Sequence, residues 1–344
     1  MEMHQTRPCS TLFYLILTVA IGVTMSCGAE ALTADEKART DLISRIQAVP
    51  ASPRYAVQAA AHGTQPPAIS MGMDTAKVIQ VDRRFHAVYS PRSRSVRLAF
   101  SSNPDGPWTE ITSLDDDDAS QPYLAQGPNG SFVLADEHGI VLSRSALKFK
   151  PYASLAALMS GKSDKEYQTT PTLSGCHEGT PDIHGISSDG SRIDVGLHYL
   201  SNCLQLERYQ LDREGFGTLN NFNTWKATAD SVRDNALTNA GFPGKHGARD
   251  DIMWRGHRFS LQEANTSEDF KWVNWGLALY DYSNHTAYQV HLNISPTCAA
   301  NPKIVLVNNP AGKQELLIAA FIPLGCAVGA RQLSGELMYL VPAQ

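Results

Sequence analysis

The segment PDIHGISSDGSRIDVGLHYL, Pro181–Leu200, contains the pattern that sets the fold of this 344-residue chain. A short apolar run leads into the turn residues Asp189-Gly190, and a run of alternating apolar residues follows the turn. Asp-Gly favours a tight hairpin because both residues tolerate a positive φ. The segment is therefore predicted to form two antiparallel strands.

The same strand–turn–strand pattern occurs five times along the chain. The other copies start near Lys77, Pro122, Asp250 and Pro302, and further short apolar strands follow several of them. A single copy could not bury both faces of its sheet, whereas neighbouring copies bury one another's faces. Three to four short strands in each of five units predict an all-β, five-bladed β-propeller. A β-sandwich or jelly roll with a similar number of strands is the alternative.

The N-terminal residues have the layout of a secretory signal peptide. Arg7 precedes the apolar run Leu12–Met25, and small residues follow, with Ala29 and Ala31 at the −3 and −1 positions of a cleavage site. The apolar run is too short to span a bilayer comfortably. We therefore expect a secreted or extracytoplasmic protein without a membrane span. A lipid anchor at Cys27 is the alternative.

A helix is predicted directly after the signal peptide, over residues 33–49. Thr33 can cap this helix and Glu36 completes a capping box, while prolines follow its end. These signals divide the chain into a signal peptide (1–31), an N-terminal helix with its connector (32–67) and the propeller (68–344).

Charge and cysteine content narrow the class of protein. The net charge of −5, with no basic block, argues against a nucleic-acid partner, and we expect a monomer. Export agrees with four cysteines outside the signal region, and none of them forms a CxxC zinc motif. Two disulfides, Cys176–Cys203 and Cys298–Cys326, are predicted because each would close a local loop.

Two of the five copies begin with similar polar residues. His177-Glu178-Gly179-Thr180-Pro181-Asp182-Ile183 aligns without gaps with His246-Gly247-Ala248-Arg249-Asp250-Asp251-Ile252. In a propeller the first strand of each blade lines the central channel, so residues at the strand starts converge on one mouth. The residues expected to meet there are His177, Glu178, Asp182, His246, Arg249 and Asp250.

Several motifs resemble those of a known enzyme family. SSNPDGPWTEI, Ser101–Ile111, resembles the strand-end element of five-bladed glycosidases of the arabinanase and β-xylosidase type, and the starts TPDI and RDDIMWRGHRFSLQEA resemble the way those enzymes begin their blades. The resemblance covers residues 68–344 and lies in the repeating pattern of the blades. It implies a secreted glycoside hydrolase acting on a poly- or oligosaccharide. The acidic residue of the family's first-blade DP element has no clear counterpart, and Asp74 matches it poorly.

Glycoside hydrolysis requires two carboxyl groups across a sugar ring, here expected at the mouth of the channel. Under this hypothesis Glu178 is the acid, and Asp250 or Asp182 is the base or the partner that tunes the pKa of the acid. The residues expected to bind the substrate are His177, His246, Arg249 and Trp254. No cofactor and no metal ligand are assigned, although a structural calcium or other ion could occupy the channel.

Structural roles are the competing interpretation for several side chains. Asp182 and Asp251 could simply accept backbone N–H groups at strand starts. Glu263 ends a strand and points either into the channel or into solvent. The tryptophans stack on sugar rings or pack between blades, and they are Trp254, Trp272 and Trp275.

Two other classes of function stay open. The missing first-blade acid favours a non-catalytic propeller that binds a glycan or a protein. His177, His246 and Asp250 suggest a metal-dependent lactonase or phosphohydrolase. The sequence contains no GxSxG, HExxH, P-loop or GxGxxG motif, which argues against the enzymes that those motifs define.

Overall fold

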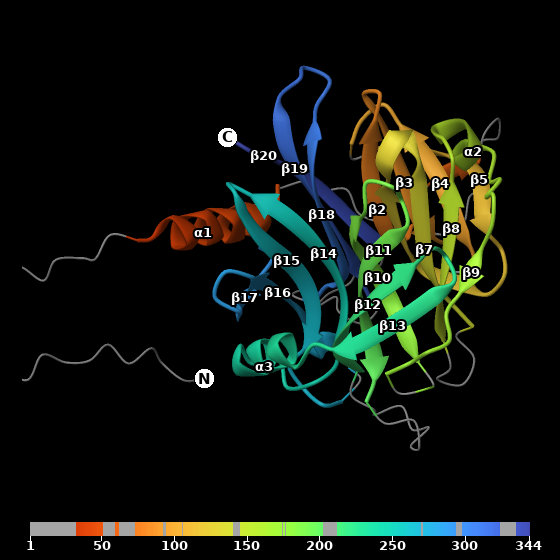
Figure 1. Ribbon diagram of the computed structural model, residues 1–344. Helices are drawn as coiled ribbons and strands as arrows, with labels where there is room; N and C mark the ends of the chain where they lie inside the picture. The colour runs from red at the N-terminus through yellow and green to blue at the C-terminus, as the bar shows by residue number, and fades with distance from the viewer. Residues whose placement is uncertain are drawn as a thin grey trace, which may run out of the picture.

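The computed structural model describes residues 32–50, 59–61, 73–91, 94–104, 106–139, 145–173, 175, 177–201, 212–269, 271–293, 298–323 and 335–344. In this part of the chain, five separate sheets form the blades of a β-propeller (Figure 1), which confirms the predicted fold class. The predicted signal peptide, with Cys27 and its cleavage site, lies outside the described residues.

The strands follow one another blade by blade. The first blade contains β1 (Ala59–Ala61), β2 (Asp74–Val81), β3 (Arg84–Ser90), β4 (Val96–Ser101) and β5 (Trp108–Asp115). The second contains β6 (Ala119–Gln126), β7 (Phe132–His138), β8 (Ala146–Tyr152) and β9 (Tyr167–Gln168). The third contains β10 (Glu178–Ile186), β11 (Arg192–Leu200), β12 (Asp212–Asn220) and β13 (Thr224–Ala229).

The remaining two blades complete the ring. The fourth contains β14 (His246–Trp254), β15 (His257–Asn265), β16 (Trp275–Asp281) and β17 (Thr286–Val290). The fifth contains β18 (Ala300–Asn308), β19 (Gln314–Ile322) and β20 (Gly335–Pro342). The innermost strands of successive blades contact one another around the axis, and these are β2, β6, β10, β14 and β18.

Hairpins join the first two strands of every blade, as predicted, and two of the turns are of the tight two-residue kind. The turn at Asp189-Gly190 is longer than predicted, since the last paired residues of its strands are Ile186 and Ile193. In the first blade Val81 pairs with Arg84, and the two residues between them have φ of 48° and 63°. In the fourth blade Trp254 pairs with His257 across Arg255 and Gly256, with φ of 49° and 85°. Positive φ at both central residues matches the right-handed twist of the paired strands.

Each inner strand also contains a β-bulge near its start, which the sequence did not reveal. The register shifts lie between Asp74 and Lys77, Ser120 and Tyr123, Gly179 and Asp182, His246 and Arg249, and Ala300 and Lys303. In four blades the bulge contains a residue with φ between 43° and 56°, namely Thr75, Gln121, Thr180 and Asn301. A bulge redirects a side chain and is common beside active sites.

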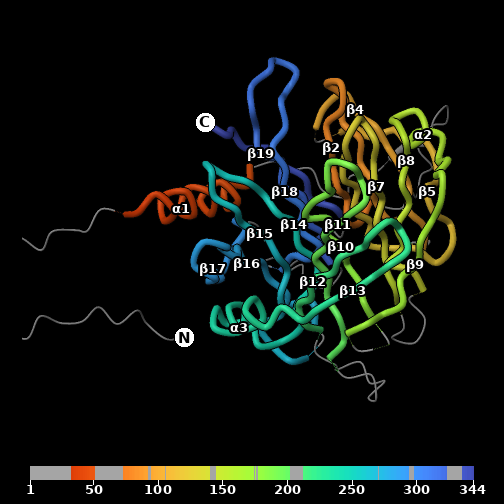
Figure 2. Tube along the Cα trace, viewed as in Figure 1, coloured from red at the N-terminus to blue at the C-terminus, as the bar shows by residue number. Residues whose placement is uncertain are grey.

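Helix α1 (Ala34–Gln47) has the predicted capping box between Thr33 and Glu36. Its buried side chains Ala38, Leu42 and Ile46 share one apolar core with the fourth and fifth blades, beside which the helix lies (Figures 1 and 2). Two shorter helices, α2 (Leu155–Met159) and α3 (Ser231–Asn239), lie in connections between strands. None of the helices in the described part of the chain is both long and apolar enough to cross a membrane.

The two predicted disulfides involve cysteines that lie outside the described residues. Cys298 is buried, but Cys176, Cys203 and Cys326 are not among the described residues. Both pairings therefore stay predictions.

Candidate active site

A cavity of about 430 Å³ lies at the end of the propeller where the inner strands begin. Three bulge residues, Gln121, Thr180 and Asn301, are part of its wall. We call this cavity the mouth pocket. Its other lining residues are Ser120, Glu137, His177, His198, Leu200, Asp212, Lys245, Glu263, Trp272 and Trp275.

Glu263, near the end of β15, is a buried carboxyl group in the wall of the mouth pocket. Burial raises its pKa to about 7, although the backbone N–H groups of Asn301 and Ala248 act in the opposite direction. The Ala248 N–H donates to Oε1 over 2.8 Å, and the Asn301 N–H donates to Oε2. A large fraction of Glu263 therefore carries a proton at neutral pH, as a general acid must.

The close packing around Glu263 explains why residue 247, in the fourth blade, is a glycine. A Cβ atom at Gly247 would stand 2.0 Å from Oε1 of Glu263. Any side chain at this position would displace the carboxyl group or the strand. Gly247, which aligns with Glu178 in the sequence, therefore provides the space that Glu263 occupies.

Asn301 connects Glu263 to a second carboxyl group. Its backbone N–H donates to Glu263, while its side-chain Nδ2 donates to Oδ1 of Asp74 over 3.1 Å. Asp74 begins β2, is partly exposed, and its negative charge contributes to the raised pKa of Glu263. Asp74 is the first-blade acid that matched the family element poorly in sequence, and the structure brings it close to Glu263.

The second and third blades contribute a third carboxylate and two histidines. Glu137 of β7 accepts the backbone N–H of Thr180 over 3.1 Å, and a Cβ at Gly179 would lie 2.3 Å from its Oε2. The Nε2 atoms of His177 and His198 are 2.8 Å apart. Burial, followed by the charges of His177 and other nearby cations, lowers the pKa of His198 well below its usual value.

Aromatic and charged side chains complete the mouth pocket. The rings of Trp272 and Trp275 have centroids 5.8 Å apart, and Lys245 lies 3.2 Å from the carboxylate of Asp212. Burial raises the pKa of Asp212, against the effect of Lys245. An indole face beside paired polar groups is a surface on which a sugar ring can stack while its hydroxyls form hydrogen bonds.

The side chains of His177 and its neighbour Glu178 lie in different parts of the structure. His177 lines the mouth pocket, whereas the Glu178 carboxylate is fully buried elsewhere. It accepts the N–H groups of Thr172 and Leu173 over 2.7 and 3.0 Å and the indole N–H of Trp225 over 2.7 Å. Glu178 thus ties a loop and the outer strand β13 to the start of β10.

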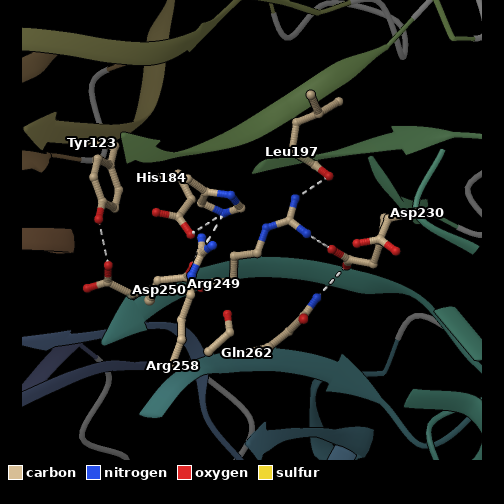
Figure 3. Close-up of polar contacts among 12 residues, drawn as sticks. Tyr123, His184, Leu197, Asp230, Arg249, Asp250, Arg258 and Gln262 are labelled. Carbon is tan, nitrogen blue, oxygen red and sulfur yellow. Dashed lines mark hydrogen bonds and ion pairs between the residues drawn. The ribbon is translucent and has the colours of Figure 1, made fainter. Parts of the chain in front are cut away.

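Asp182 and Asp250 lie on the inner strands beyond the bulges, within a buried group of charges. We call this group the channel cluster, and it consists of Lys77, Tyr123, Asp182, His184, Asp250, Asp251 and Lys303. Figure 3 shows the hydroxyl of Tyr123 directed at Asp250, over 2.7 Å. Lys77 Nζ lies 2.5 Å from the same carboxylate, and the N–H of Ile304 donates to it over 2.8 Å.

The pKa values of the two channel aspartates are shifted in opposite directions. Burial raises the pKa of Asp250, although Lys77 opposes it. Burial opposes ionisation of Asp182 too, but the charge and hydrogen bond of His184, whose Nε2 is 3.2 Å away, together with the charges of Lys303 and Arg249, lower its pKa. The described lining of the mouth pocket includes neither aspartate.

Arg249 and His246, both predicted to bind substrate, are enclosed between blades. The guanidinium of Arg249 pairs with the carboxylate of Glu214. It also donates to the carbonyl of Leu197, as Figure 3 shows. The His246 ring nitrogens contact the Asp234 carboxylate at 2.9 Å and a backbone carbonyl at 3.1 Å. Both side chains are buried and outside the described lining of the mouth pocket.

Trp254 is also placed away from the mouth pocket. Its indole N–H donates to Asp41 of helix α1 over 3.0 Å, and its ring belongs to the core beneath that helix. Of the seven residues that the sequence singled out, the structure therefore places His177 in the mouth pocket. The catalytic and binding roles of the other six stay predictions, with their side chains in the positions given above.

Comparisons with known proteins agree on the fold. No protein-family model matches the chain, and no curated protein matches it. An endo-arabinase from Bacteroides thetaiotaomicron VPI-5482 superimposes with a TM-score of 0.51 at 11% identity, over 78% of this chain and 93% of the other. An exo-1,5-α-L-arabinanase from a bovine ruminal metagenomic library gives 0.51 at 9% identity, over 78% and 92%.

A mutant α-L-arabinanase from Cellvibrio cellulosa gives a TM-score of 0.52 at 8% identity, over 78% of this chain and 91% of the other. At such identities the likeness establishes a shared five-bladed propeller fold. The structural resemblance to arabinanase-type glycosidases, which the blade motifs suggested, is thereby confirmed.

Proposed function

We propose that this protein is a glycoside hydrolase that cleaves a poly- or oligosaccharide bound in the mouth pocket. The observation that carries the proposal is the pair of carboxyl groups, Glu263 and Asp74, joined by Asn301 at the mouth of the propeller. Glycoside hydrolysis requires one carboxyl group that donates a proton and a second that is ionised. The predicted signal peptide adds that the substrate is met outside the cytoplasm.

Glu263 is the proposed general acid. Its raised pKa of about 7 keeps a proton available for the leaving-group oxygen at neutral pH. Asp74, partly exposed in the first blade, is the proposed second carboxylate, which activates water or attacks the anomeric carbon. Its charge favours the protonated form of Glu263, as a like charge does for a neighbouring acid.

Trp272 and Trp275 are the proposed stacking surface for a sugar ring, and Lys245 and Asp212 the proposed partners of its hydroxyls. Arabinan and xylan oligosaccharides are the first substrates to test. Solved structures of similar fold include an α-L-arabinanase complexed with arabinohexaose.

The test is hydrolysis of an oligosaccharide panel by protein without residues 1–31, followed by two matched substitutions. Glu263→Gln should lower the rate at neutral pH by about 10²- to 10⁴-fold because the proton donor is lost. Glu178→Gln changes the same group outside the pocket and should retain activity if thermal unfolding shows a folded protein. Loss of activity in Glu178→Gln with retention in Glu263→Gln would contradict the role proposed for Glu263 and support the sequence-based assignment of Glu178 as the acid.

A second candidate is a propeller that binds a glycan without cleaving it. The observation in its favour is that the Glu263 carboxyl group already accepts two backbone N–H groups, a structural role that needs no catalysis. Calorimetric binding of an oligosaccharide that is recovered intact after long incubation would support this candidate over the hydrolase.

A further inference from the structure

One wall of the mouth pocket contains two histidines and a carboxylate from different elements. Glu137 comes from β7, His177 immediately precedes β10, and His198 lies on β11. One ligand atom of each, a carboxylate oxygen or a ring nitrogen, lies within 4.8 Å of the other two. Ligands about 2 Å from one ion stand about 3 Å apart, so small side-chain rotations would let all three reach a shared ion.

The outer nitrogens of both histidines are held by hydroxyl groups. His177 Nδ1 is 2.6 Å from Oγ of Ser145, and His198 Nδ1 contacts Oγ1 of Thr180. These contacts direct both Nε2 atoms to the same point, 2.8 Å apart. A metal-binding imidazole characteristically has its second nitrogen fixed by an oxygen partner in this way.

The alternative to a metal ion is a hydrogen bond between the two Nε2 atoms, which would use the lone pair of one ring instead of both. In such a bond one Nε2 donates and the other accepts, so only one ring contributes a lone pair. An ion between the rings would use both lone pairs and would also neutralise the buried charge of Glu137.

We propose that Glu137, His177 and His198 form a binding site for one divalent transition-metal ion, with Zn²⁺ as the best match. Two imidazoles and one carboxylate are a common zinc set, which leaves a coordination position for water or a substrate oxygen. All three residues line the mouth pocket, so the open position would face the bound ligand. The site uses neither Glu263 nor Asp74, so it does not depend on the proposed hydrolytic reaction.

A second group of possible ligands, Asp182, His184 and Asp251, lies in the channel. There Arg258 already pairs with Asp251 over 2.5 Å, and Tyr282 donates to the same carboxylate over 2.9 Å. These partners compete with a cation for the lone pairs of Asp251. We therefore assign the ion to the mouth pocket, and the experiment below distinguishes the two positions.

The test is calorimetric titration of ZnCl₂ into the chelator-treated mature chain, with Co²⁺ absorption as a second readout. We expect one bound ion and a tetrahedral Co²⁺ spectrum. His177→Ala and Glu137→Gln should each weaken binding by about 100-fold or more, and Ser145→Ala by about 10-fold. His291→Ala removes an exposed histidine outside the site and should change nothing.

Three results would overturn the proposal. The first is Zn²⁺ binding no tighter in the unmodified protein than in His177→Ala. The second is loss of binding in His184→Ala with normal binding in His177→Ala, which would place the ion in the channel. The third is a Co²⁺ spectrum that the Glu137 and His177 substitutions leave unchanged. His177 is only half-buried, so His177→Ala provides the decisive comparison if His198→Ala fails to fold.

Discussion

The mouth pocket and the channel cluster are both rich in carboxylates, but they stabilise them in different ways. In the channel cluster Asp250 is paired with the ammonium group of Lys77 and the hydroxyl of Tyr123. In the mouth pocket Glu263 has backbone N–H groups as partners, and the cavity lies beside it. The comparison of these two groups indicates that the ion pair of Asp250 with Lys77 holds blades together, whereas Glu263, held by backbone N–H groups beside a cavity, can exchange a proton.

The first prediction removes Lys77, the lysine of the channel cluster that contacts Asp250. Lys77→Met should lower the free energy of unfolding by about 3–5 kcal/mol because it leaves a buried aspartate without its ion-pair partner. Chemical denaturation at neutral pH measures the change. A loss below 1 kcal/mol would show that the channel charges are not held as described, and the comparison between the two regions would fail.

The second prediction concerns the pH dependence that burial gives to Glu263. Its pKa of about 7 lies above its unfolded value near 4.5, so the folded state holds the proton more tightly. This contribution to stability is complete below pH 4.5 and is lost as the pH rises to about 7. Relative to Glu263→Gln, the unmodified protein should lose about 3 kcal/mol between pH 4 and pH 8.

Urea unfolding of both proteins across this pH range is the measurement. Other titrating groups affect both proteins alike, so the difference isolates Glu263 to a first approximation. Parallel curves for the two proteins would mean that the pKa of Glu263 is not raised.

The third prediction tests the space beside Glu263. Gly247→Ala should destabilise the protein by about 1–3 kcal/mol because the new Cβ would meet the carboxyl group. Gly185→Ala is the matched control, since a Cβ there has no neighbour within 4 Å. Thermal melts of the two variants compare them directly, and equal shifts would show that the tight fit at Gly247 does not exist.

The smallest effect is expected at the surface. Arg192 pairs with Asp194 over 2.9 Å, but its side chain is 56% exposed, so solvent weakens the interaction. Arg192→Met should change the free energy of unfolding by less than about 1 kcal/mol. A loss as large as that of Lys77→Met would mean that burial does not govern the strength of these ion pairs.

Much of the propeller was predictable from local sequence. Turn residues such as Gly190 and Gly256 identified the hairpins because a positive φ is a local requirement, and Thr33 with Glu36 identified the start of α1. The number of blades followed from counting these hairpins. The bulges were not predictable, since nothing in the residue types requires the register to shift.

The site was harder because its residues come from strand ends that meet only after folding. Attention to the starts of the inner strands identified His177, but His198 and Glu137 lie on the second strands. The hairpin register alone could not identify them. Counting outward from the turns pairs Gly179 with Leu200 and Ser120 with His138, whereas the bulges shift these partners to His198 and Glu137.

Glu178 shows that a residue can stand out in the sequence because of the contacts that its side chain makes within the fold. It stood out because the aligned position in the next blade is Gly247. In the structure Gly247 makes room for Glu263, and Glu178 instead accepts hydrogen bonds from a loop and from Trp225. The partner of each side chain, which decides its role, lies in a different part of the sequence.

The most direct test of the central claim is the pH dependence of kcat/KM on the best oligosaccharide substrate. This quantity reports the ionisation of the free enzyme. With Glu263 as the acid, kcat/KM should fall as the pH rises through about 7, because the carboxyl group loses its proton there. A rate that stays constant from pH 6 to pH 9 would contradict the assignment of Glu263 and, with it, the mouth pocket as the site of hydrolysis.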